Sequence, residues 1–246
     1  MAKLIDWIQI ALISLVTVLS AVLGFCFLPF GQQKAIYWSS QFWSTLLIAI
    51  CGVRLSYQEK SAIPNDKARI YISNHQSHFD IPALFKVLPV PLFFIAKKEL
   101  QKVPFMGWYM QAVGMIFIDR SNREKAFNSI RQAGAQIKKG KNVFSFPEGT
   151  RSASGEVKMF KRGTFILARE NNIEVVPIAI RGAGQIIPAQ SFTISPGKVE
   201  VIIGEPIVPA NHANLTLEQF AAYCRQRVIE LQTETSLTRE GTLSAV

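Results

Sequence analysis

A histidine and an aspartate, His75 and Asp80, lie close together in the segment Asn74–Asp80, which follows residues typical of a short buried strand. In a continuous helix these two side chains would point about 140° apart and could not meet. Across a strand-to-helix turn, the carboxylate can fold back onto the imidazole. The carboxylate would then hold one ring nitrogen and leave the other to accept a proton from a hydroxyl group.

Simpler interpretations of the same residues stay open. Asp80 could be the N-cap of a helix that carries Pro82, and His75 could be a buried histidine with ordinary hydrogen bonds. His75 and His78 also have a spacing found in zinc sites, which together with Asp80 would suggest a metal-dependent hydrolase. However, the only other histidine is His212, and the sequence has no cysteine cluster, so we expect no metal site and no cofactor.

A second motif, Phe146–Ser152, also follows a predicted strand and reads Phe-Pro-Glu-Gly-Thr-Arg-Ser. Gly149 lets the backbone approach a ligand closely, while the Thr150 hydroxyl and the Arg151 guanidinium are donors suited to phosphate oxygens. The alternative is a solvated turn with an arginine on the surface.

Basic groups also follow two other predicted strands, Lys97 in the first case and Arg120 in the second. Open α/β sheets bind ligands at the carboxyl ends of their strands, although solvated charges at a helix start would look the same. The chain has no Gly-x-Ser-x-Gly motif, and its three cysteines lie in apolar or helical settings. A His–Asp base would therefore activate a hydroxyl supplied by a substrate.

The composition of the 246 residues indicates one compact domain with an appendage, because 49% are hydrophobic and only 18% are charged. The formal net charge is +10, and the region 86–169 holds sixteen Lys and Arg residues against five acids. Positive charge next to an apolar segment suggests anionic lipid headgroups or a phosphorylated substrate. We expect no nucleic acid, because no nucleic-acid-binding signature accompanies this charge.

The N-terminal region carries that apolar segment. No charged residue occurs from Trp7 to Phe30, and a helix over Ile10–Leu28 would be about 28 Å long, close to the hydrocarbon thickness of a bilayer. A second stretch, Ile36–Val53, is more polar in its first half and suits an interface better than a bilayer core. The two stretches could form a spanning hairpin or a helix pair half-sunk in one leaflet. A signal peptide and ordinary core helices are the alternatives.

The rest of the chain alternates short strands with helices, which predicts an α/β architecture with a mixed, largely parallel sheet flanked by helices. We expect membrane-anchoring helices in 1–58, the α/β domain in 59–235 and a frayed tail in 236–246. Strands are predicted at 68–73, 92–96, 115–118, 142–146 and 174–180, with a hairpin at 191–194 and 198–203. Helices are predicted from 80 onward and over 122–139, 159–171 and 216–232.

Four segments together resemble a known family. Asn74-His75-x4-Asp80, Gly114–Arg120, Phe146–Arg151 and Val176–Ile178 are similar, in order and spacing, to the four sequence blocks of the glycerolipid acyltransferases of the His-x4-Asp type. Within the family, the resemblance is greatest to bacterial members that acylate lysophosphatidic acid. It implies the glycerol-phosphate-acyltransferase-like α/β fold with an N-terminal two-helix membrane motif.

The resemblance also implies a reaction. His75, oriented by Asp80, would take the proton from the sn-2 hydroxyl of lysophosphatidic acid, whose oxygen attacks the thioester of acyl-CoA or acyl-carrier protein to give phosphatidic acid. Backbone N–H groups around Gln76–His78 are our hypothesis for stabilising the oxyanion. The groups expected to hold the substrate phosphate are Lys97, Arg120, Glu148, Gly149, Thr150 and Arg151.

The expected partners are thus a membrane lipid and the acyl donor. The excess of Lys and Arg favours the cytoplasmic face of the cytoplasmic membrane for the catalytic domain. Two other functions stay open at this point. The chain could acylate a different lyso-lipid, or it could be a non-catalytic module that uses its basic face to recruit partners to a membrane.

Overall fold

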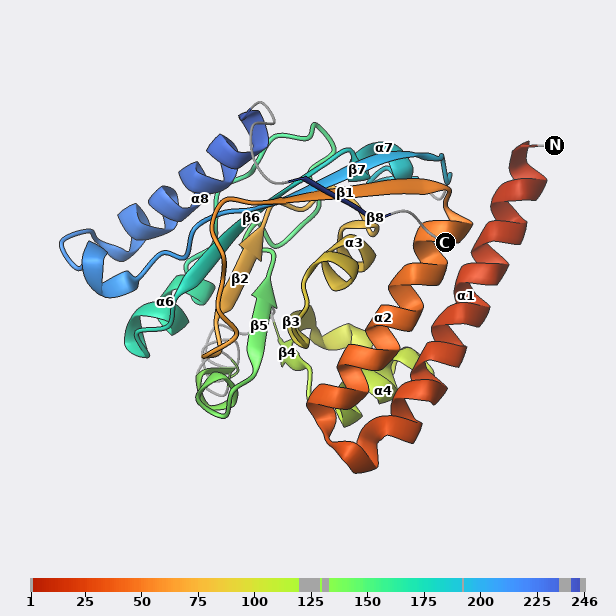
Figure 1. Ribbon diagram of the computed structural model, residues 1–246, viewed down its shortest axis with the longest axis horizontal. Coiled ribbons are helices and arrows are strands. Elements are labelled where there is room, and N and C mark those ends of the chain that lie inside the picture. The colour runs from red at the N-terminus through yellow and green to blue at the C-terminus, as the bar shows by residue number, and fades with distance from the viewer. Residues whose placement is uncertain (1, 120–128, 130–132, 192, 235–239, 244–246) are drawn as a thin grey trace.

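The structure is a computed structural model that describes residues 2–119, 129, 133–191, 193–234 and 240–243. Its centre is one mixed eight-stranded sheet with strand order β4-β3-β5-β2-β6-β7-β1-β8 (Figure 1). Strands β4, β3, β5, β2 and β6 are mutually parallel, whereas β7 runs antiparallel to β6, and β8 runs antiparallel to β1. The carboxyl ends of the five parallel strands therefore meet at one edge of the sheet. The strands are β1 Val53–Glu59, β2 Ile70–Ser73, β3 Leu92–Lys97, β4 Ile116–Ile118, β5 Asn142–Ser145, β6 Val175–Arg181, β7 Gly197–Ile203 and β8 Glu240–Leu243.

Helices cover both faces of this sheet. The α-helices are α1 Ala2–Phe27, α2 Gln32–Ile50, α3 Asp80–Val87, α4 Met106–Ala112, α6 Gly163–Glu170, α7 Ala183–Ile186 and α8 Leu217–Thr233. The short 3-10 helices among the described residues are η1 Leu28–Phe30, η2 Lys98–Lys102 and η3 Pro209–His212, and residues 133–138 are also helical. Helices α1 and α8 lie at opposite ends of the molecule (Figure 1).

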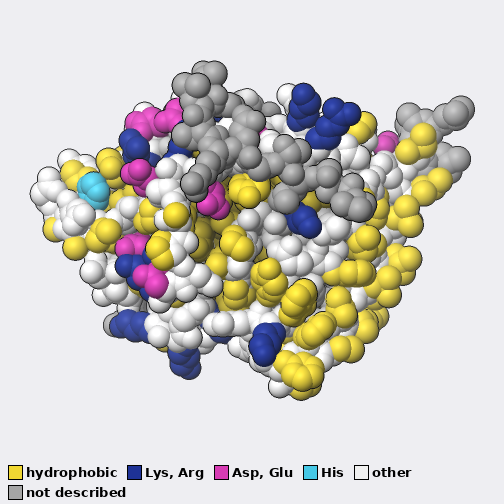
Figure 2. All heavy atoms as spheres, viewed as in Figure 1, with side chains coloured by type: hydrophobic (Ala, Val, Ile, Leu, Met, Phe, Trp, Pro, Cys, Tyr) yellow, Lys and Arg dark blue, Asp and Glu magenta, His cyan; other side chains and the backbone are white. Residues whose placement is uncertain are grey.

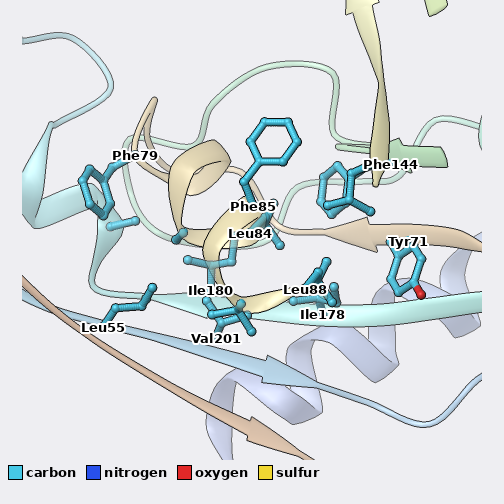
Figure 3. Packing of buried hydrophobic residues seen from close by; sticks show 14 of the residues in the cluster. Leu55, Tyr71, Phe79, Leu84, Phe85, Leu88, Phe144, Ile178, Ile180 and Val201 are labelled. Atoms are coloured by element: carbon cyan, nitrogen blue, oxygen red, sulfur yellow. The ribbon is translucent and has the colours of Figure 1, made fainter. Parts of the chain in front are cut away.

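The two faces of the sheet separate the core into two clusters, because successive side chains of a strand point to opposite faces. On one face, Tyr71 of β2 and Ile178 of β6 pack under α3, whose Leu84 is fully buried there (Figure 3). On the other face, Ile70 and Ile72 pack against α6 and α8. The sheet edge that carries the catalytic candidates is thus supported from both sides.

Helix α2 belongs to this folded domain. Its buried face, which includes Ala35, Ile36 and Ile48, joins the same cluster as α3. Its polar side chains bind the domain too, since Gln41 donates to the carbonyl of Phe85. Helix α1 packs along α2 and presents an apolar stripe to the outside. Figure 2 shows hydrophobic side chains gathered along this flank of the molecule.

The predicted fold class is confirmed, and all five predicted parallel strands are present within one or two residues of the predicted bounds. The prediction of a hairpin at 191–194 and 198–203 is wrong. Only its second strand exists, as β7, which pairs with β6 and β1. The described residues at 191 and 193–196 form no strand, and the Ser195 amide instead donates to the carbonyl of Ile186.

Two further boundaries differ from the prediction. The expected boundary at residue 58 cuts through β1, whose alternation of buried Val53 and Leu55 with exposed Arg54 marks a strand of the α/β domain. The tail is not frayed throughout, because β8 pairs antiparallel with β1 and covers what would otherwise be an open sheet edge. Most of the helix predicted over 122–139 lies outside the described residues.

Candidate active site

The catalytic candidates begin where β2 ends. Asn74, which is 1% exposed, donates from its amide nitrogen to the carbonyl of Ile180 and accepts from the amide of the same residue, at 2.9 and 2.8 Å. Because Ile180 belongs to β6, one side chain joins the ends of the two neighbouring strands. The chain leaves the sheet immediately afterwards, so the position of His75 is fixed relative to both strands.

His75 and Asp80 do meet across the turn, as predicted. The Nδ1 atom of His75 lies 2.7 Å from Oδ2 of Asp80, which is the first residue of α3. Asp80 is fully buried, whereas the side chain of His75 keeps 17% of its surface exposed. The phenyl ring of Phe146 stacks on the imidazole, with ring centroids 3.9 Å apart and an angle of 13° between the planes. The imidazole is therefore fixed through its edge and one face.

The same carboxylate oxygen also holds the backbone of the turn. Oδ2 of Asp80 accepts hydrogen bonds from the amides of Gln76 and Ser77, at 2.8 and 2.9 Å. These two N–H groups are therefore already bound, which contradicts our hypothesis that they stabilise the oxyanion. Of the three candidates, only the His78 amide has no acceptor within the part of the chain that the structure describes.

Glu148 is buried, with 4% of its surface exposed, and both of its oxygens face backbone amides. Oε1 accepts from the His75 amide at 2.8 Å, and Oε2 accepts from the Lys158 amide at 3.2 Å. Burial raises the pKa of Glu148, and the two amides partly offset that rise. The carbonyl of His75 in turn accepts from the Ser152 amide. The motif after β5 thus clamps the His75 peptide from both sides.

Thr150 and Arg151 of this motif face outward. Gly149 has a φ of +76°, which side chains other than glycine rarely adopt, and it turns the chain so that Thr150 is exposed and Arg151 half-buried. Nζ of Lys158 donates to the carbonyl of Arg151 at 2.8 Å and brings a further positive charge to the loop. This end of the motif offers the donors that a phosphate needs.

Lys97 ends β3 and is exposed at the same edge of the sheet, where it pairs in register with Ile118 of β4. Its neighbour Lys98 makes an ion pair with Asp119 at 3.3 Å. Arg120, which we expected to contact the phosphate, lies outside the described residues.

His78 differs from His75 in its surroundings. Its side chain is exposed, yet the protein atoms crowded around it, followed by the positive charge of Arg151, lower its pKa. Among the described residues, no group of three or more His, Cys, Asp or Glu side chains could hold a metal ion.

Sequence reasoning missed three contributors to this site. Phe146 was noted only as the start of a motif, Asn74 had no role, and Lys158 was not considered. The signal for Lys158 was available in the cluster Lys158, Lys161 and Arg162, because this cluster follows the phosphate-type motif within a few residues. No local pattern indicates that a phenylalanine will stack on a histidine 71 residues earlier in the chain.

Comparison with known proteins defines the class. A model of the Acyltransferase family matches residues 54–181, which include every described residue of the site. The chain therefore belongs to this family.

Individual relatives are more specific. A 1-acyl-sn-glycerol-3-phosphate acyltransferase of Saccharomyces cerevisiae is 35% identical over 167 residues, which cover 67% of this chain and 55% of the relative. A protein of the same name from Haemophilus influenzae is 28% identical over 238 residues, which cover 92% and 96% of the two chains. This chain thus spans about half the length of the first relatives it matches, but nearly all of the bacterial one.

Among solved structures, the 1-acyl-sn-glycerophosphate (LPA) acyltransferase PlsC from Thermotoga maritima has a similar fold. Its TM-score is 0.77 at 26% identity, and the match covers 96% of this chain and all of that one.

Proposed function

We propose that this chain is an acyltransferase that moves an acyl chain from acyl-CoA or acyl-carrier protein to the sn-2 hydroxyl of 1-acyl-sn-glycerol 3-phosphate, giving phosphatidic acid. The contact between Nδ1 of His75 and Oδ2 of Asp80 is the observation that carries the proposal. The names of the yeast and bacterial relatives support the choice of acceptor.

His75 is the general base in this reaction. Asp80 holds the hydrogen on Nδ1, so Nε2 is the nitrogen that takes the proton from the sn-2 hydroxyl. The hydroxyl oxygen forms a bond to the thioester carbonyl carbon, and the C–S bond then breaks. The leaving thiolate takes the proton back from the imidazolium, so the enzyme ends unchanged. The His78 amide is our candidate donor to the oxyanion.

The substrate phosphate binds at the outward end of the second motif. Thr150 and Arg151 supply a hydroxyl and a guanidinium there, Gly149 provides the close backbone approach, and Lys97 adds charge from the end of β3. Arg120 is a further phosphate partner in this proposal. Glu148 differs from the others, because its two oxygens already hold backbone amides. We assign it the task of positioning His75.

The apolar flank supports an association with a membrane. One stretch, Ile5–Phe30, is long and apolar enough to cross a bilayer by length and composition. Its exposed side chains recur every three or four residues at Ile5, Ile8, Leu12, Leu15, Leu19 and Val22. Since α1 packs along α2 and α2 is part of the domain core, we propose that the pair lies in one leaflet. The positive-inside tendency favours the cytoplasmic face.

Acyl transfer by the detergent-purified full chain tests the proposal. We expect phosphatidic acid from lysophosphatidic acid with acyl-CoA or acyl-carrier protein, and none from the His75→Ala variant. His212→Ala is the matched control, because His212 lies on η3 beside α8 and should leave the activity unchanged. Product from His75→Ala would contradict the role of the base. Product only with another lyso-lipid would contradict the acceptor.

A further inference from the structure

The segment from η2 to α4 breaks the usual rule that a short surface helix hides its apolar side chains. Four of its residues are large, apolar and exposed, namely Leu100, Val103, Phe105 and Trp108, at 36%, 38%, 45% and 53%. Phe105 also has a φ of +58°, a backbone conformation that bulky residues rarely adopt. An exposed apolar group of this kind on a surface otherwise rich in charge marks an interaction site.

Close packing fixes this segment against its neighbours. A Cβ atom at Gly107 would lie 2.3 Å from the carbonyl oxygen of Leu100, so glycine alone allows α4 to pack onto η2. On the other side, Tyr109 of α4 contacts α1 and α2. Its ring lies 5.6 Å from that of Phe25, and its hydroxyl hydrogen-bonds to Ser39.

These contacts make the η2–α4 surface continuous with the apolar flank of α1 and α2. The residues next to Ser39 and Tyr109 are Trp38 and Trp108, and each exposes 53% of its surface. Phe25 of α1, which is 39% exposed, contacts Tyr109 of α4, and Phe27 of α1 stacks on Trp38 of α2. Tryptophan is the residue that gathers at the headgroup level of bilayers, which identifies the kind of partner this surface fits.

The charges of η2 agree with that partner. Lys97, Lys98 and Lys102 are exposed on or beside η2, against the acids Glu99 and Asp119, of which Asp119 pairs with Lys98 at 3.3 Å. Lysines close to apolar side chains attract anionic lipid headgroups and leave the apolar groups to enter the acyl boundary.

We propose that η2–α4 is a second membrane-inserting element, separate from the N-terminal helices, and that its partner is an anionic phospholipid leaflet. The inference rests on the proposed membrane association. The inference also bears on substrate binding. Strand β3 ends at Lys97, one of the proposed phosphate-binding residues, and η2 begins at the next residue. With η2 at the headgroup level, the phosphate-binding end of the site opens at the depth where the phosphate of lysophosphatidic acid lies.

Lipid-depth quenching of a fluorescent label in the full-length protein tests this. In a Cys26→Ser background, single cysteines replace Trp108, Leu15 or Met159 and carry the same label. Leu15 represents α1, with 54% exposed. Met159 is the matched control, since it is even more exposed, at 73%, and its loop is held by Arg225 of α8, far from α1. A Val103→Cys variant provides a second label site in the segment.

The vesicles contain phosphatidylglycerol and phosphatidylethanolamine, with or without nitroxide-labelled lipid. We expect the labels at 108 and 103 to be quenched by the nitroxide lipid several-fold more than the label at 159, and to be shielded from aqueous iodide. Lys102→Glu should weaken lipid quenching at 108 about fivefold on these vesicles and much less on phosphatidylcholine.

Two outcomes would overturn the inference, and they differ in what else they overturn. If the label at 15 is quenched while those at 108 and 103 behave like the label at 159, the inference alone fails. If the labels at 15, 108 and 103 all behave like the label at 159, the proposed membrane association fails together with the inference.

Discussion

The catalytic edge and the apolar flank depart from the usual partition of polar and apolar groups in opposite ways. At the edge, polar side chains are buried, with Ser77 and Asp80 at 0% and Glu148 at 4% exposed. Along the flank, large apolar side chains are exposed, with Trp7 at 69% and Phe30 at 66%. Buried polar groups and exposed apolar patches are the two observations that carry functional information.

The difference teaches how each region is stabilised. Oδ2 of Asp80 and both oxygens of Glu148 accept from backbone amides, which offsets the cost of burying them, whereas Oδ1 of Asp80 has no hydrogen-bond partner among the described residues. The exposed apolar groups of the flank have no such compensation from the protein, and a bilayer would supply it. Activity at the catalytic edge should therefore depend on single hydrogen-bonding atoms. Membrane binding by the flank should depend on the total apolar area and the charge.

The largest effect should come from Asp80→Asn. The amide can keep one oxygen toward the Gln76 and Ser77 amides but loses the charge that fixes the His75 tautomer. By analogy with other His–Asp pairs we expect kcat to fall about 10³- to 10⁴-fold with the fold retained. Steady-state kinetics and a thermal midpoint measure the two effects. Asp66→Asn is the control, because Asp66 is an exposed carboxylate in a surface ion pair. An equal loss of kcat in Asp80→Asn and Asp66→Asn would show that activity does not depend specifically on the carboxylate beside His75.

The second effect concerns Glu148 and separates positioning from binding. Glu148→Ala leaves the His75 and Lys158 amides without acceptors, which should cost about 2–4 kcal/mol in the free energy of unfolding. A displaced His75 should lower kcat about 100-fold with little change in KM for the lyso-lipid. If KM rises instead while kcat holds, Glu148 contacts the substrate directly.

Glu148→Gln adds a test by pH. Because burial raises the pKa of Glu148 above its unfolded value, its contribution to stability is fully present below the unfolded pKa and is lost as pH rises through the folded pKa. The stability of the wild type relative to Glu148→Gln should therefore fall across that window. Denaturant unfolding at several pH values measures it, and a difference that stays constant with pH would contradict the assignment.

Arg151 should show the converse pattern to Glu148. Replacing Arg151 by Gln removes a charge-assisted contact with the phosphate, so KM for lysophosphatidic acid should rise about tenfold with kcat nearly unchanged. Lys198→Gln is a suitable control, because Lys198 is an exposed cation on β7. An unchanged KM would place the phosphate elsewhere.

The sequence predicts the edge better than the flank, for physical reasons. Strand periodicity and the motif order locate His75, Asp80 and Arg151, because parallel strands bring their carboxyl ends to one edge. The same reasoning cannot tell that Glu148 faces inward while Arg151 faces outward, since that depends on the turn at Gly149. On the flank, hydropathy identifies α1 but does not indicate the membrane contact that we propose for α4, because α4 is short and only partly apolar.

The smallest effect should come from the polar contact within the flank. The Tyr109 hydroxyl of α4 hydrogen-bonds to Ser39 of α2, and burial raises the pKa of Tyr109 to about 12. Tyr109→Phe should lower the free energy of unfolding by about 1 kcal/mol, and Ser39→Ala should add little to it, because both remove the same bond. A double-mutant cycle by denaturant unfolding in detergent measures this coupling. Fully additive effects would mean that the hydrogen bond between Tyr109 and Ser39 contributes nothing to the stability of the flank.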